Sequence, residues 1–143
     1  MNIDRCPSTL VPGFTSYSPA GLRKLFDGKK VSPILPYDAP DIHGEPEEFL
    51  KNREHISISG VQEKLSVLVD QGTIRLTKSG EQGTHLLKPI SSRLARASDM
   101  PANEHVTMQI AAQLFGISTA PNGLCFFPVS YTHLRAHETR GNL

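Results

Sequence analysis

Three short apolar segments separated by glycine-containing turns limit what this chain can fold into. Residues 67–69 and 73–77 are rich in β-branched side chains, and Gly72 supplies the positive φ angle that a tight turn between two strands needs. A second turn follows, and residues 84–88 then form a third apolar segment that Pro89 ends. This order predicts a small antiparallel sheet.

A short helix is predicted before the sheet, over residues 18–26. Ser18 suits the N-cap position, and Pro19 suits the first helical position, where its missing N–H costs nothing. Asp27 and Gly28 end the helix. Its predicted apolar face consists of Leu22, Leu25 and Phe26.

A longer helix is predicted after the sheet, over residues 103–115. Pro101 precedes it, and Gly116 lies where a terminating glycine belongs. The predicted apolar face is Met108, Ala111, Ala112 and Phe115, widened by Ile110 and Leu114. Two further extended pieces are predicted, an edge segment over residues 31–35 that contains Pro33 and a last apolar strand over residues 124–129.

The pattern predicts an α+β fold in three parts. Residues 1–53 form a leader with the short helix and a proline-rich connector, and residues 54–129 carry the sheet and the longer helix. Residues 130–143 break abruptly from the strand before them and resemble translated sequencing-adapter sequence, so we predict that they are not native. His133 and His137 in this tail have the spacing of one helical face, but no third metal ligand accompanies them, and no metal site is predicted.

The composition excludes several classes of protein. The 143 residues include 15 basic and 14 acidic side chains, which argues against a broad nucleic-acid-binding surface. No apolar run approaches the ~20 residues needed to cross a membrane, and the amino terminus does not read as a signal peptide. Cys6 and Cys125 are far apart and match no metal-binding spacing. A reduced, cytoplasmic protein with two structural thiols is expected.

The loop before the first strand, over residues 57–64, combines hydroxyls with a glycine. Backbone N–H groups near Gly60 can cradle phosphate groups, although the loop has one glycine where a kinase loop has three. Ser57 and Ser59 lie where a phosphoryl group could reach them, and a phosphate there would add about −1.5 to −2 charges to an anion-binding loop. The alternative is an ordinary Ser/Gly turn.

A lysine and a glutamate complete this arrangement. Lys88 lies at the end of the third predicted strand, and Glu104 lies at the start of the longer helix. A strand lysine that is held by a helix glutamate is the order found in a kinase N-lobe. The alternatives are a surface lysine and a carboxylate stabilised by the helix dipole.

Together these motifs resemble the HipA family of bacterial serine/threonine kinase toxins. The matching segments are Ser57-Ile58-Ser59-Gly60-Val61-Gln62-Glu63-Lys64, Thr84-His85-Leu86-Leu87-Lys88-Pro89, and Asn103-Glu104 leading into Met108-Gln109-Ile110-Ala111. The region before them looks like the HipT branch, in which the usual amino-terminal partner-binding subdomain is absent. The resemblance covers roughly residues 5 to 129.

The resemblance implies a kinase-like N-lobe that binds ATP and Mg²⁺. It implies phosphorylation of an aminoacyl-tRNA synthetase by the full-length protein, an antitoxin partner, and autophosphorylation of Ser57 or Ser59. The nucleotide-binding residues that it implies are Ser59, Gly60, Val61, Gln62, Lys88 and Glu104.

The family places its catalytic aspartate and magnesium ligands in a helical lobe beyond this region, so the fragment is expected to be inactive alone. That lobe is expected to dock on an exposed apolar surface. Two other readings stay open: a non-catalytic module that binds an antitoxin or another protein, and an unrelated small α+β domain.

Overall fold

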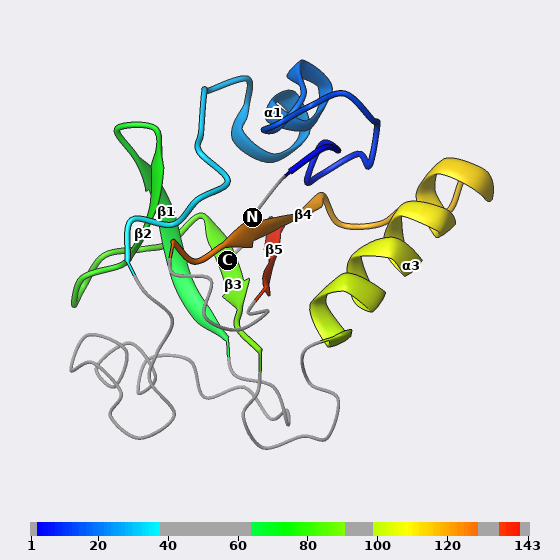
Figure 1. Ribbon diagram of the computed structural model, residues 1–143. Coiled ribbons are helices and arrows are strands. Elements are labelled where there is room, and N and C mark those ends of the chain that lie inside the picture. The colour runs from blue at the N-terminus through cyan, green and yellow to red at the C-terminus, as the bar shows by residue number, and fades with distance from the viewer. Residues whose placement is uncertain (1–2, 38–63, 91–98, 129–134, 141–143) are drawn as a thin grey trace.

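The computed structural model describes residues 3–37, 64–90, 99–128 and 135–140, the last of these as backbone only. Figure 1 shows a sheet with one helix above it and another beside it. The described elements are α1 (Pro19–Phe26), β1 (Leu65–Asp70), β2 (Thr73–Leu76), β3 (His85–Lys88), α3 (Met100–Leu114), β4 (Asn122–Phe126) and β5 (Arg135–Arg140). The α+β class that the sequence predicts is confirmed. None of the described helices is long and apolar enough to span a membrane.

The three predicted strands form one side of the sheet. β1 pairs with β2 and with β3, both antiparallel, in the sheet order β2-β1-β3-β5-β4. Gln71 and Gly72 form the two-residue turn between β1 and β2 and have φ angles of 47° and 79°. Two positive φ angles give the turn the twist that a tight hairpin favours, so the prediction at Gly72 is confirmed.

The tail supplies a strand that the sequence did not predict. β5 lies between β3 and β4 and pairs antiparallel with both. His137 lies opposite Lys88 on one side and Leu124 on the other. His137 therefore lies in a strand and not on the helical face that was considered for the histidine pair, because β pairing gives this segment an extended backbone. His133 lies outside the described residues. The non-native origin of residues 130–143 stays a prediction.

α1 forms as its local sequence dictates. The Gly21 N–H donates to Ser18 Oγ at 3.2 Å, and Pro19 lies at the start of the helix. Asp27 ends the helix with a φ of 53°. Leu25 and Phe26 are buried, as the predicted apolar face requires.

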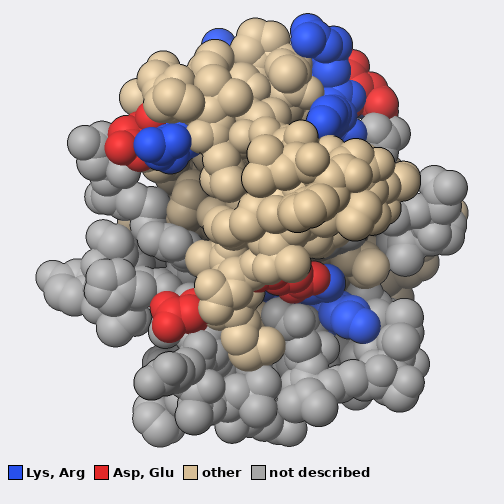
Figure 2. All heavy atoms as spheres, turned by 90° about the vertical axis from the view of Figure 1, so that its right-hand side faces the viewer, with Lys and Arg blue, Asp and Glu red and all other residues tan. Residues whose placement is uncertain are grey.

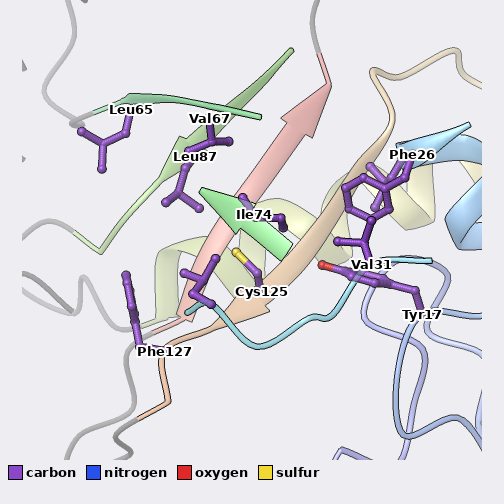
Figure 3. Packing of buried hydrophobic residues seen from close by; sticks show 11 residues of the cluster. Tyr17, Phe26, Val31, Leu65, Val67, Ile74, Leu87, Cys125 and Phe127 are labelled. Atoms are coloured by element: carbon purple, nitrogen blue, oxygen red, sulfur yellow. The ribbon is translucent and has the colours of Figure 1, made fainter. Parts of the chain in front are cut away.

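The core lies between α1 and the sheet (Figure 3). Gly123 of β4 permits the close approach, because a Cβ built there would lie 2.8 Å from Leu25 Cδ1. His85 of β3 ties the helix end to the sheet, since its Nε2 donates to the Leu25 carbonyl at 2.8 Å. The core cluster comprises Tyr17, Leu25, Phe26, Val31, Leu35, Leu65, Val67, Ile74, Leu87, Cys125 and Phe127.

The amino-terminal segment is more ordered than its sequence indicates. Cys6 is fully buried, and its sulfur accepts the Ser18 N–H at 3.1 Å and the Thr9 N–H at 3.4 Å. Cys125 is also buried and is not part of a disulfide. The edge segment predicted over residues 31–35 is also found, because Ile34 forms a parallel bridge with Phe126 at the end of β4.

The predicted inner face of α3 is partly wrong. The helix begins at Met100 because Pro101 fits within its first turn, and Gly116 ends it with a φ of 65°, as predicted. The side chains at the carboxyl end point to solvent: Leu114 is 76% exposed and Phe115 is 72% exposed. The buried residues of this helix are instead Pro101 and His105.

The exposed apolar side chains gather on and just after α3. Figure 2 views the α3 side of the molecule and shows a broad area without charged side chains. No Asp, Glu, Lys or Arg occurs between Glu104 and Arg135. We call the following set the α3 ridge: Val106, Ile110, Leu114, Phe115 and Ile117.

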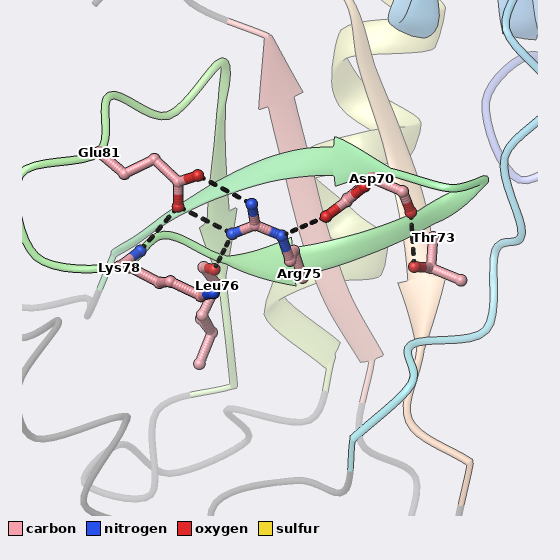
Figure 4. Close-up of polar contacts among 6 residues, drawn as sticks. All are labelled: Asp70, Thr73, Arg75, Leu76, Lys78 and Glu81. Atoms are coloured by element: carbon pink, nitrogen blue, oxygen red, sulfur yellow. Dashed lines mark hydrogen bonds and ion pairs between the residues drawn. The ribbon is translucent and has the colours of Figure 1, made fainter.

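A cluster of charged side chains ties the β1–β2 hairpin to the loop that follows it (Figure 4). Arg75 donates to both carboxylate oxygens of Glu81 at 2.8 Å and to Asp70 Oδ2 at 2.8 Å. The Lys78 backbone N–H donates to Glu81 at 2.9 Å. The Arg75 hydrogen bonds, aided by the Lys78 N–H, lower the pKa of Glu81 to about 2.

This cluster predicts an acid-dependent loss of stability. Its contribution is fully present above the unfolded-state pKa of Glu, about 4.3, and is lost as pH falls from there toward about 2. We expect Glu81→Gln to flatten the change in the urea unfolding midpoint between pH 6 and pH 3. Asp4→Asn, at an exposed carboxylate outside the cluster, is the control. Equal pH dependence of Glu81→Gln and wild type would contradict the prediction.

Candidate functional site

Lys88 and Glu104 meet at the junction of β3 and α3. Lys88 Nζ donates to Glu104 Oε1, and the two residues form a salt bridge. The side chains are 18% and 32% exposed, respectively. The ion pair that the sequence analysis expects is present, and its role in nucleotide binding stays a prediction.

The strand and the helix bring the pair together from positions sixteen residues apart. Lys88 is the last residue of β3, before Pro89, and Glu104 lies in the first turns of α3. α3 packs against β4 and β5, and β5 is the direct neighbour of β3. The helix therefore presents Glu104 beside the end of β3.

The pair has the chemistry of an anion site. A lysine ammonium carries three N–H donors, and Glu104 accepts from one of them, so Lys88 can bind a phosphate oxygen at the same time. A partly buried cation is screened less by water than an exposed one. Lys88 therefore has the donors that a phosphate group would need, and phosphate binding at the pair stays a prediction.

The residues that the sequence analysis assigns to a phosphate loop lie outside the described residues: Ser57, Ser59, Gly60, Val61 and Gln62.

The described chain resumes at Lys64, and β1 begins at Leu65. Leu65 lies opposite Leu87, the neighbour of Lys88 in β3. The end of the loop segment thus enters the sheet beside the strand that carries the lysine.

A buried polar network lies on the inner side of α3. Asn122 Oδ1 accepts from His105 Nδ1 at 2.6 Å and from Gln109 Nε2 at 3.0 Å. Asn122 Nδ2 donates to the Ala120 carbonyl at 2.9 Å, which fixes the orientation of the amide. Burial lowers the pKa of His105 and the bond to Asn122 opposes this, so the ring is neutral near pH 7 with its proton on Nδ1.

Sequence reasoning missed this network. The available signal is a stripe with helical spacing, because Pro101, His105 and Gln109 recur every four residues. The sequence analysis instead predicted that the apolar residues of the same helix form its inner face. Among the described residues, no group of three or more His, Cys, Asp or Glu side chains could hold a metal ion.

A protein-family model for the HipA-like C-terminal domain matches residues 56–134, more than half of the chain. The chain belongs to the HipA family. The match contains the loop segment, Lys88 and Glu104, so the candidate site of this HipA-family chain lies wholly within it. A comparison with curated proteins gives no match.

Proposed function

We propose that this chain is the ATP-binding N-lobe of a HipA-like serine/threonine kinase toxin. The observation that carries the proposal is the ion pair between Lys88 of β3 and Glu104 of α3, within a segment that matches the HipA family. Phosphoryl transfer depends mainly on the positioning and neutralisation of phosphate groups. A strand lysine held by a helix carboxylate supplies a fixed cation for this task.

In this proposal, Lys88 and Glu104 supply one part of nucleotide binding. Lys88 binds phosphate oxygens, and Glu104 keeps the ammonium at the end of β3. We assign the loop residues Ser59, Gly60, Val61 and Gln62 to the phosphate groups, through backbone N–H donors. Bound ATP would supply the transferable phosphoryl group, and Mg²⁺ its charge neutralisation. The Mg²⁺ ligands and the catalytic aspartate are expected in a helical lobe that follows residue 129.

The test of this function is direct titration of the chain with Mg²⁺·ATP. Saturable binding that depends on Lys88 supports the proposal. Binding that is unaltered in Lys88→Ala would remove the role assigned to the lysine.

Autophosphorylation of Ser57 or Ser59 is the second part of the proposal. A phosphate on either serine adds about −1.5 to −2 charges to an anion-binding loop, so it repels ATP and switches the kinase off. We expect a full-length protein that carries Ser57→Ala with Ser59→Ala to lose incorporation of labelled phosphate into this loop. Phosphopeptide mass spectrometry, with each single variant as control, assigns the site. Unchanged stoichiometry in the double variant would refute the proposal.

For the full-length protein, we propose a cytoplasmic kinase of the HipT type. Its protein substrate is an aminoacyl-tRNA synthetase, and an antitoxin protein is its partner. The resemblance in the loop and around Lys88 supports these assignments.

The α3 ridge favours a second candidate function. Its five apolar side chains are each more than 40% exposed and lie in a segment without charge. Such a surface suits a protein interface, either with the catalytic lobe or with a separate partner. A chain that binds a protein partner but not Mg²⁺·ATP would be a non-catalytic interaction module.

A further inference from the structure

α3 fully buries few of its side chains, and Met108, Ala111 and Ala112 are half-buried. Its two buried residues are Pro101 and His105, and its first turn has no hydrogen bond from a capping side chain. Its large aliphatic side chains are exposed: Val106, Ile110 and Leu114. Apolar contact is also non-directional, whereas hydrogen bonds constrain distance and angle. The hydrogen bonds of this helix therefore constrain its rotation about its axis more sharply than its apolar contacts do.

Two of those hydrogen bonds converge on Asn122 of β4. His105 and Gln109 both donate to its Oδ1, and Ser8 Oγ donates to its backbone carbonyl at 3.1 Å. Asn122 is 3% exposed and its amide is held by the Ala120 carbonyl, so it is a fixed reference point for the helix.

The residue anchored to β4 adjoins the residue that pairs with Lys88. Glu104 and His105 are neighbours in α3, and their side chains are about 100° apart around the helix axis. β4 and β3 are separated in the sheet by β5. A rotation or slide of α3 that breaks the bond to Asn122 thus also displaces the Glu104 carboxylate from Lys88.

We propose that His105 is a positioning residue: its hydrogen bond to Asn122 fixes the rotation of α3 and so holds Glu104 against Lys88. The consequence for ATP rests on the proposed function, because a displaced Glu104 leaves Lys88 less well placed for phosphate. The effect on the ion pair itself does not depend on nucleotide binding.

The experiment measures how fast an N-hydroxysuccinimide ester acylates the Lys88 amine, read by peptide mass spectrometry and normalised to exposed Lys29 in the same sample. Glu104→Gln gives the rate of a lysine without its ion-pair partner. We expect His105→Leu to raise the Lys88 rate toward that value, by about fivefold, the factor that corresponds to the net contribution of one hydrogen bond.

Two further variants separate positioning from a general loss of structure. In His105→Asn the side-chain Nδ2 takes the place of the ring Nδ1 as donor to Asn122, so the Lys88 rate should return toward wild type. Thr107→Ala is the control on the same helix, because the Thr107 side chain is exposed and lies outside the hydrogen bonds to Asn122. If His105→Leu does not fold, His105→Gln replaces it. The glutamine keeps a polar side chain, but its donor lies at the position of the ring Nε2 and not of Nδ1, so we expect it to lose the bond to Asn122 and to raise the Lys88 acylation rate.

The proposal is overturned if Glu104→Gln raises the Lys88 acylation rate but the folded His105→Leu or His105→Gln variant keeps the wild-type rate. That result would show that His105 only supports the fold. An unchanged rate in Glu104→Gln would overturn the proposal too, because the ion pair would then be absent in solution. Absence of ATP binding to the wild-type chain would refute the proposed function alone, since the acylation rates still decide the role of His105.

Discussion

Replacing Lys88 with alanine is expected to weaken Mg²⁺·ATP binding by about 10- to 100-fold. A hydrogen bond to a charged group contributes about 1.5–3 kcal/mol, and the ammonium of Lys88 is a partly buried donor held in place by Glu104. The variant also leaves the Glu104 carboxylate near the phosphate groups without its counter-charge, which adds like-charge repulsion.

Titration calorimetry at fixed ionic strength measures this loss. Lys29→Ala, at an exposed lysine away from the pair, is the matched control and should bind like wild type. Lys88→Arg keeps the charge but replaces a compact ammonium with a planar fork, so it should recover only part of the affinity. Wild-type affinity in Lys88→Ala would show that phosphate is bound elsewhere.

Replacing Leu25 with alanine is expected to destabilise the fold by about 2–5 kcal/mol. Leu25 is fully buried and packs against Gly123 of β4, so its removal leaves a cavity at the α1–sheet contact. We expect the melting temperature to fall by about 5–15 °C.

Leu114→Ala makes the same chemical change at a side chain that is 76% exposed. Its effect should lie within about 0.5 kcal/mol of zero. Thermal unfolding followed by circular dichroism compares the two variants directly. An equal loss of stability in both would mean that α3 is covered in solution or that Leu25 is not part of the core.

Local chemistry made α1 and the hairpin predictable. Ser18 and Pro19 define a helix start by themselves, and Gly72 defines a tight turn without reference to any distant residue. The third strand followed from the turn-forming residues 79–83 before it and from Pro89 after it. Each of these features depends on a few consecutive residues, so the sequence contains the whole physical reason.

The face of α3 could not be predicted in this way. Apolar periodicity indicates which residues share a face, but not whether the sheet offers an apolar or a polar partner to that face. β4 offers Asn122, and so His105 and Gln109 turn inward while Ile110 and Leu114 remain exposed.

The sequence by itself determined the α+β class, the first three strands with a helix on each side of them, and the choice of Lys88 and Glu104 as a candidate pair. Only the tertiary structure decided that Lys88 and Glu104 touch, that β5 lies between β3 and β4, and that Asn122 anchors α3. The reason is that backbone preferences act over a few residues, whereas strand pairing and side-chain hydrogen bonds join residues that are far apart in the chain.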